Sequence, residues 1–370
     1  MWCGTHGILD PCGADEGWEL IITAYIKDVM TGVNYNNKSV VRSATCRGYA
    51  AAVNHLFTLR DFPAPCKFDD KENMIATIIH NLEREEDIAT QRSPLTSEIF
   101  AELKRMADAT PEDSPENAVF NIVCFGRITG PRASEYAQKT QTKVEQHKYP
   151  SGKEVIKAFV SDDFEFYDKK GRRIRTRTAK SLSRVHHMRA RWRIQKNRQN
   201  GQGLKIMADL ANPEICPVRN AFLLVLRKTR LEHSLELPLA IFVNKTGAIK
   251  YLTASKIADV IRAAARTVHP DLTEEEIKKF SAHSIRVWAC VLLSEAGKDP
   301  DFIKSRLRWM GESYRTYLRD TDKITTQHRD ALEAATAEVM KLLAGNLDEL
   351  QLPDDTPEDN DMGEYEDIIN

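Results

Sequence analysis

The sequence lacks the features of a membrane or secreted protein. None of its apolar runs approaches the roughly 18 residues that a membrane-spanning helix needs. The first residues, MWCGTHGILDPCGADEGW, have neither the charged segment nor the apolar segment of a secretory signal peptide. We therefore expect a soluble, intracellular protein.

Cysteines are few, and their spacing shows no pairing pattern. Seven cysteines are scattered over 370 residues without a CxxC pair, which favours a reducing compartment over a disulfide framework. Cys3, His6 and Cys12 come nearest to a metal-ligand cluster, but their spacing is irregular and unlike that of structural zinc sites. The sequence predicts neither a metal site nor a cofactor.

Acidic residues are missing from one long segment and basic residues from another. From Lys169 to Lys205 there are fourteen Lys or Arg and no Asp or Glu, whereas residues 346–370 carry ten acidic residues and no basic one. The formal net charge of −1 hides these two poles. Because so many like charges repel one another unless an anion lies nearby, we interpret the basic segment as a contact surface for a polyphosphate partner. The acidic tail is predicted to be disordered.

Length and hydrophobic periodicity predict two domains. At 370 residues, 42% of them hydrophobic, the chain is long enough for more than one core. Apolar residues recur at three- and four-residue spacing through the first third, which predicts a helical domain over residues 1–110. A second domain over 111–345 and the acidic tail, 346–370, follow. Helices are predicted at 15–32, 39–60, 72–85, 96–108, 118–128, 217–231, 253–268, 273–279, 283–296, 300–308 and 313–340.

The clearest strand lies in the basic segment. In HMRARWRI, residues 187–194, apolar residues alternate with arginines, which predicts a buried face and three outward guanidiniums. An Asn- and Gly-rich turn and LKIMADL follow, so residues 185–209 are predicted to form a β-hairpin with Lys196 near its tip. FEFYD, residues 164–168, is a candidate third strand. The predicted fold is mainly α with a small antiparallel β-sheet.

Several charged residues occupy positions that suit an anion. His283 and Arg286 lie three residues apart at the start of a predicted helix, where they share a face and lie near free backbone N–H groups. Arg132 follows a Gly-Pro turn between apolar helices, where its guanidinium needs Glu135 or an external anion as a partner. Taken singly, each residue also has an ordinary explanation as a cap, a surface charge or a local ion pair.

In chain order, these residues resemble the catalytic series of the tyrosine recombinases, also called the phage-integrase family. TGPRASE, 129–135, is similar to that family's Gly-x-Arg-x-Ser-Glu segment, AHSIRV, 282–287, to its His-x-x-Arg segment, and YLRD, 317–320, to the context of its nucleophile. LRWMGESYRTYLR, 307–319, is most similar to eukaryotic mobile elements of the DIRS and Crypton type. The resemblance covers residues 115–335. The catalytic residues that it implies are Arg132, Lys196, His283, Arg286, Trp309 and Tyr317.

Two features depart from the family's pattern. Trp309 lies eight residues before Tyr317, whereas the family usually has nine, so Tyr314 stays open as an alternative nucleophile. Pro131, directly before the first arginine, is also unusual and bears on how Arg132 approaches a phosphate.

The resemblance implies a DNA strand transferase that needs neither a metal ion nor ATP. Arg132, supported by Glu135, and Arg286 would neutralise the phosphodiester, and Tyr317 would attack it to give a 3′-phosphotyrosyl link. Lys196 would protonate the leaving oxygen. His283 would assist proton transfer, while the indole of Trp309 would pack against the phosphate or donate a hydrogen bond to it.

The partners that the resemblance implies are double-stranded DNA and further copies of the chain. The helical first domain would act as a core-binding domain that clamps the DNA against the catalytic domain, and four copies would assemble on two sites. Nuclear localisation would follow for a eukaryotic source. The arginines predicted to contact DNA are Arg189, Arg191, Arg193 and Arg198. Three alternatives stay open: an inactive DNA-binding regulator derived from a recombinase, a type IB topoisomerase-like enzyme, and an RNA-binding protein.

Overall fold

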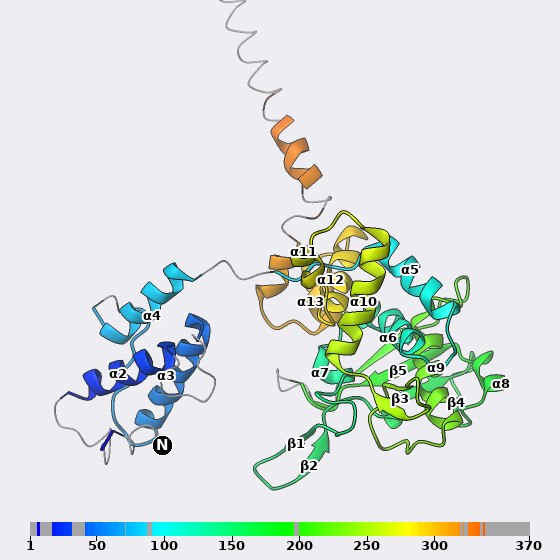
Figure 1. Ribbon diagram of the computed structural model, residues 1–370, viewed down its shortest axis with the longest axis horizontal. Coiled ribbons are helices and arrows are strands. Elements are labelled where there is room, and N and C mark those ends of the chain that lie inside the picture. The colour runs from blue at the N-terminus through cyan, green and yellow to red at the C-terminus, as the bar shows by residue number, and fades with distance from the viewer. Residues whose placement is uncertain are drawn as a thin grey trace, which may run out of the picture. The chain divides into compact units, whose positions relative to one another are not determined.

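The chain forms two compact units, Met1–Gln91 and Arg92–Asn370. The computed structural model describes residues 6–7, 17–31, 41–70, 72–86, 91–195, 200–318, 321, 325–333 and 336. Figure 1 shows the two units, each of which has its own hydrophobic core. Among the residues described, no helix is both long and apolar enough to cross a membrane.

In the described part of the first unit, three helices pack around a small core. They are α2 (Trp18–Thr31), α3 (Ser43–Thr58) and α4 (Met74–Glu85). Each helix contributes fully buried side chains, for example Ile26, Cys46 and Ile79. The predicted helical character of the first third is therefore confirmed.

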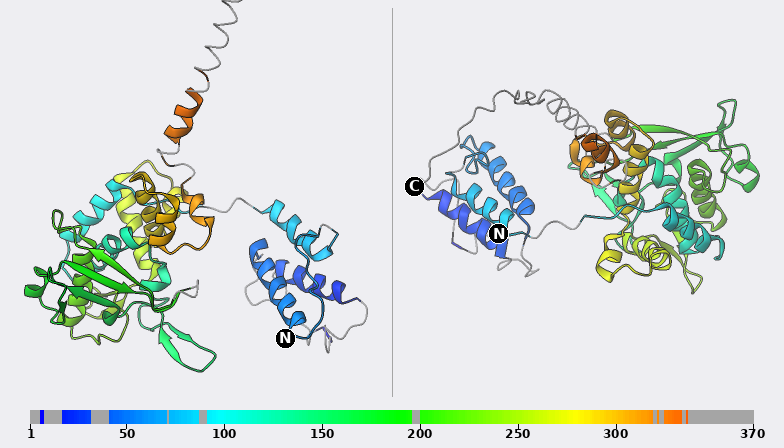
Figure 2. Two further views of the ribbon diagram at one scale, coloured as in Figure 1. Left: turned by 180° about the vertical axis from the view of Figure 1, so that it is seen from behind. Right: turned by 90° about the horizontal axis from the view of Figure 1, so that it is seen from above.

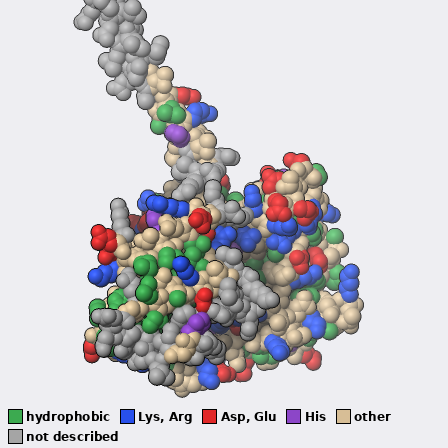
Figure 3. All heavy atoms as spheres, turned by 60° about the vertical axis from the view of Figure 1, so that its left-hand side comes forward, with side chains coloured by type: hydrophobic (Ala, Val, Ile, Leu, Met, Phe, Trp, Pro, Cys, Tyr) green, Lys and Arg blue, Asp and Glu red, His purple; other side chains and the backbone are tan. Residues whose placement is uncertain are grey.

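The two units differ in surface charge. Residues 1–91 carry 8 Lys or Arg and 13 Asp or Glu, whereas residues 92–370 carry 45 and 41, and ten of these acidic residues lie in the tail, 346–370. Hydrophobic side chains are also exposed on the first unit, and some are visible in green in Figure 3. Those most exposed are Leu20, Leu56, Leu59, Phe62 and Met74. The excess of positive charge, which would attract a nucleic acid, therefore lies in the second unit.

The second unit begins near residue 92, whereas the sequence pattern placed the division at about residue 110. The reason is that α5 (Ser97–Asp108) packs against α6 (Pro115–Thr129) and α10 (Ala254–Val268), and buries Ile99 and Leu103 in the core of this unit. The remaining α-helices with assigned bounds are α7 (Ala133–Tyr136), α8 (Ala179–Leu182), α9 (Pro217–Arg230), α11 (Glu274–Lys279), α12 (Ser284–Glu295) and α13 (Pro300–Leu307).

The prediction of one helix over 313–340 is wrong. A 3₁₀-helix, η2, covers Glu312–Tyr317, and Leu318 lies in a turn. A separate helical segment covers residues 325–333. Tyr317 consequently lies at the end of a short 3₁₀ turn.

The main sheet has four antiparallel strands in the order β4-β3-β5-β6. Their bounds are β3 (Phe164–Tyr167), β4 (Arg173–Ile174), β5 (His187–Arg191) and β6 (Gly203–Met207). The pairing of β5 with β6 confirms the predicted hairpin, and β3 confirms the candidate third strand. Met188 and Ala190 are fully buried on the inner face, and α9 packs against β3 and β6 (Figure 1). The predicted fold class is confirmed.

Two short hairpins were not predicted. They are β1 (Gln146–Lys148) with β2 (Glu154–Ile156), and β7 (Ile241–Val243) with β8 (Ile249–Tyr251). The β1–β2 hairpin projects from the body of the second unit (Figure 2). Each strand has only three residues, too few for a period-two pattern to stand out in the sequence.

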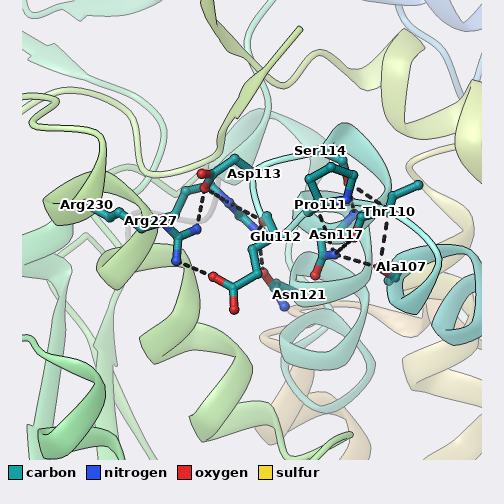
Figure 4. Close-up of polar contacts among 10 residues, drawn as sticks. All are labelled: Ala107, Thr110, Pro111, Glu112, Asp113, Ser114, Asn117, Asn121, Arg227 and Arg230. Carbon is teal, nitrogen blue, oxygen red and sulfur yellow. Dashed lines mark hydrogen bonds and ion pairs between the residues drawn. The ribbon is translucent and has the colours of Figure 1, made fainter. Parts of the chain in front are cut away.

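The loop between α5 and α6 is fixed by arginines from α9. Arg227, only 3% exposed, donates from Nη2 to the Glu112 carbonyl at 2.8 Å and to Asn121 Oδ1 at 2.8 Å. Arg230, nearer the surface, pairs with the carboxylates of Glu112 and Asp113 (Figure 4). This network holds the start of α6, the helix whose other end leads into the candidate active site.

We expect the two arginines to differ sharply in their contribution to stability. Arg227→Ala should lower the free energy of unfolding by about 3 kcal/mol, because it leaves buried acceptors without a donor. Arg230→Ala should cost less than about 1 kcal/mol, since its ion pairs are solvent-exposed. Urea denaturation of the two variants measures the difference, and equal losses would contradict this view of the loop.

Candidate active site

The turn after α6 carries Arg132. α6 ends at Gly130, whose φ of 49° and ψ of 51° lie in the left-handed region that favours glycine. The Arg132 amide then donates to Glu135 Oε2 at 2.9 Å, and its Nη1 lies 3.3 Å from Glu135 Oε1. The Arg132 side chain is 26% exposed, so a phosphate can still reach its guanidinium.

Glu135 is a buried carboxylate surrounded by donors. Besides the two Arg132 groups, it accepts the indole N–H of Trp192 at 3.0 Å and Nη2 of Arg308 at 3.1 Å. A buried carboxylate without partners would be costly, so these donors stabilise its charge. In return, Glu135 fixes the positions of two guanidiniums.

Arg286, in the first turn of α12, is a buried cation with spare hydrogen-bonding capacity. It is 2% exposed, its Nη1 donates to the Gly130 carbonyl, and its Cζ lies 4.1 Å from the centre of the Trp309 ring. Among the described residues, Nη2 has no hydrogen-bond partner. Burial, followed by the charges of Arg132 and Arg308, lowers the pKa of Arg286 to about 9. A buried donor that lacks an acceptor, next to other cations, favours binding of an anion.

His283 and Tyr317 are hydrogen-bonded to each other. Nε2 of His283 lies 2.9 Å from the Tyr317 hydroxyl, and the Trp309 and Tyr317 ring centres are 5.7 Å apart. Burial, and then the positive charges of Arg286 and Arg92, lower the pKa of His283 below its ordinary value. The lowered pKa favours the neutral imidazole at pH 7, whose Nε2 can accept the phenolic proton.

The resting phenol is not activated by its cationic neighbours. Burial raises the pKa of Tyr317, and Arg286 offsets this only in part. Nearby guanidiniums therefore do not make this phenol more acidic than an ordinary tyrosine in the resting site. Deprotonation needs a base, and His283 lies at hydrogen-bonding distance.

Tyr314, the alternative nucleophile, faces the core. It is 1% exposed and packs with Cys290, Ile303 and Leu307 between α12 and α13. A phosphodiester in a DNA duplex could reach it only after this cluster opened. Tyr317, by contrast, is half-buried, is hydrogen-bonded to His283 and lies beside Trp309.

The structure brings together five of the six candidate catalytic residues. Contacts link Arg132 and Arg286 through the turn at Gly130, and link Arg286, Trp309, Tyr317 and His283 through rings and hydrogen bonds. Lys196 and Arg198 lie outside the described residues. Trp192, the residue directly after β5, donates its indole N–H to Glu135.

Arg189 and Arg191 lie on the exposed face of the sheet, as predicted. Arg189 is paired in register with Glu165 on β3 and with Lys205 on β6. Nε of Arg193 donates to the buried Asp163 carboxylate at 2.5 Å, and Nη2 of Arg191 lies 3.6 Å from the same carboxylate. Arg193 is therefore also a structural residue.

We expect Arg189 and Arg193 to behave differently when each is replaced by alanine. Arg189→Ala should reduce the slope of log affinity for DNA against log salt by about 1, because one phosphate contact is lost. Its unfolding free energy should be unchanged. Arg193→Ala should cost about 2 kcal/mol of stability, since it removes the closer partner of a buried carboxylate. Salt titration and urea denaturation of both variants separate the two roles.

Three site residues were not predicted from the sequence. Arg308 lies 7% exposed beside Glu135, Trp192 contributes an N–H in addition to its apolar face, and Arg92 lies close enough to lower the pKa of His283. Arg308 directly precedes the candidate residue Trp309, and this adjacency was the one sequence feature that could have pointed to Arg308 as a site residue. The other two contacts join segments that are far apart in the sequence.

No protein-family model matches the sequence, and no curated protein matches it. The chain is similar to the solved structure of the Tn1549 transposon integrase in complex with circular intermediate DNA, with 11% identity, 85% of each chain covered and a TM-score of 0.41. It is also similar to the XerA recombinase, with 14% identity, 86% of this chain and 94% of the other covered, and a TM-score of 0.35. These neighbours are an integrase and a recombinase.

Proposed function

We propose that the chain is a tyrosine-type DNA strand transferase, a site-specific recombinase or integrase. The observation that carries the proposal is the proximity of two groups. One is a buried arginine whose Nη2 has no hydrogen-bond partner among the described residues, and the other is a half-buried tyrosine hydrogen-bonded to a histidine whose pKa is lowered. These residues are Arg286, Tyr317 and His283. Their sequence context resembles that of eukaryotic mobile elements of the DIRS and Crypton type.

The two guanidiniums act on the charge of the phosphodiester. Attack on phosphorus raises the negative charge on its non-bridging oxygens, and Arg132 and Arg286 offer planar donors to them. Trp309, stacked on Arg286, shields this guanidinium from water and carries an indole N–H that has no partner among the described residues. That N–H is a further donor for the phosphate.

The bonds and protons balance without an external energy source. Oη of Tyr317 attacks phosphorus, and its proton passes to Nε2 of His283. The bond from phosphorus to the 5′ oxygen breaks, and Lys196 gives that oxygen a proton. One phosphodiester is exchanged for another, so a 5′ hydroxyl of the same or another duplex can reverse the step.

DNA is held chiefly by the second unit in this proposal. Its excess of Lys and Arg over Asp and Glu, and the exposed sheet face with Arg189 and Arg191, supply phosphate contacts. The first unit, with more acidic than basic residues, serves as the core-binding domain through a limited set of contacts. Assembly of four copies on two sites belongs to the same proposal.

Convergence of the candidate residues favours an enzyme over an inactive DNA-binding regulator. A regulator has no need for a histidine aligned with a tyrosine beside two arginines. An RNA-binding protein would use the basic hairpin and leave this arrangement unused.

Covalent capture from a random pool of duplexes tests the proposal and selects the DNA site in the same experiment. The full chain is incubated with randomised duplexes that are nicked on one strand, in the presence of EDTA and without ATP. After cleavage, the short strand end beside the nick diffuses away. Protein–DNA species that survive denaturant are isolated and sequenced. We expect covalent complexes that share a sequence; a complete lack of them across the pool would contradict the proposal.

The proposal also sets the pH dependence of cleavage. His283 accepts a proton only when neutral, and its pKa lies below the ordinary value of about 6.5. The single-turnover rate should therefore be level near pH 7 and fall only at pH values below about 6.5. His283→Gln should lower the rate and remove this acid limb. An acid limb that persists unchanged in His283→Gln would assign it to another group.

A further inference from the structure

Arg308 has an unusual backbone conformation for an arginine. It follows the last residue of α13 with φ 58° and ψ 47°, in the left-handed region, and the Trp309 amide donates back to the Lys304 carbonyl at 2.9 Å. Helices that end this way usually have glycine at this position, because a β-carbon is strained there. A strained residue persists when its side chain makes contacts that hold it in place.

The Arg308 side chain makes contacts with three other elements. Its Nη1 donates to the carbonyl of Thr129, the last residue of α6, at 3.1 Å, and its Nη2 to Glu135 of α7 at 3.1 Å. Its Cζ lies 3.7 Å from the centre of the Trp192 ring, directly after β5. Arg308 thus joins the end of α13 to the turn that carries Arg132 and to the base of the basic hairpin.

The segment that begins at Arg308 carries the proposed nucleophile. The next residue, Trp309, stacks on Arg286, and Tyr317 follows within η2. Resting on the proposed function, we propose that Arg308 is a positioning residue: it fastens residues 309–318 to the arginine-bearing turn and so sets the approach of Tyr317 to the phosphate.

Arg308 is not the phosphate ligand in this arrangement. Both of its terminal nitrogens are committed to protein acceptors, and one face of its guanidinium is covered by Trp192. Donors of this site that lack a hydrogen-bond partner among the described residues are Nη2 of Arg286 and the indole N–H of Trp309. A lysine could not replace Arg308, since an ammonium cannot stack on the indole and bridge two acceptors in one plane.

Arg308→Gly is the test variant, because glycine keeps the left-handed turn and removes the guanidinium. Glu232→Gly is the matched control: Glu232 is exposed and also left-handed, with φ 51°. With the duplex selected by covalent capture, Arg308→Gly should form the covalent complex about 10- to 100-fold more slowly, while DNA affinity stays within about two-fold. Arg308→Lys should recover little of the rate, and Glu232→Gly should match the wild type.

A readout that does not require catalysis separates this proposal from the proposed function. In hydrogen exchange on the full chain without DNA, amides of residues 309–318 should exchange about ten-fold faster in Arg308→Gly than in the wild type or Glu232→Gly. Unchanged exchange together with wild-type cleavage would overturn the proposal. A loss of DNA affinity equal to the loss of rate would make Arg308 a DNA contact instead.

Discussion

Tyr317→Phe is expected to abolish covalent complex formation with nicked DNA, while DNA affinity stays unchanged. The phenolic oxygen is the atom that bonds to phosphorus, so its removal eliminates the step and does not merely slow it. The ring is retained, and its contact with Trp309 at 5.7 Å between centres is preserved. Denaturing gel electrophoresis after incubation with the captured duplex measures the covalent species.

Tyr314→Phe is the matched control, three residues away on the same 3₁₀-helix. Because Tyr314 is buried in the cluster with Cys290 and Leu307, its loss of a hydroxyl should leave covalent trapping in place. Trapping that persists in Tyr317→Phe and disappears in Tyr314→Phe would reverse the assignment of the nucleophile.

Arg286→Ala is expected to reduce the single-turnover cleavage rate by about 10²- to 10³-fold. The guanidinium is the buried donor whose Nη2 lacks a partner among the described residues, and loss of one preorganised donor to a developing oxyanion has an effect of this size. Arg286→Lys should recover only part of the rate, since an ammonium cannot donate in the same plane while stacked on Trp309. Rapid-quench kinetics on the captured duplex gives the rates.

The control for Arg286 is Arg266→Ala, which removes an exposed arginine of α10 paired with Glu274. It should cleave at the wild-type rate. If the DNA affinity of Arg286→Ala fell enough to account for the whole loss of rate, Arg286 would contribute to ground-state DNA binding and not to stabilisation of the transition state.

Local patterns were sufficient to predict most elements of the fold. The side chain of Thr96 accepts from the Ile99 amide at 3.3 Å before α5, and Thr273 with Glu276 forms a capping box before α11, both of which are short sequence patterns typical of helix starts. The alternation in residues 187–194 predicted β5 and its buried face. The single helix predicted over 313–340 was wrong, because apolar spacing alone does not reveal the 3₁₀ turn that ends at Tyr317.

The site was predictable only as far as sequence motifs reach. Arg132, His283 and Tyr317 lie in short segments whose order resembles a known series, and the structure brings those segments together. The support around them could not be predicted in this way. Arg308 takes part because of a left-handed turn and contacts with residues more than 100 positions away, which no local pattern encodes.

The most direct test identifies the residue that becomes linked to DNA. Trypsin cleaves after Arg308, Arg315 and Arg319, so the two candidate tyrosines fall on different peptides, residues 309–315 and residues 316–319. Mass spectrometry of the covalent complex, after nuclease digestion, should find the nucleotide mass on the peptide TYLR. The same mass on WMGESYR, or on neither peptide, would contradict the proposal that Tyr317 attacks the phosphodiester.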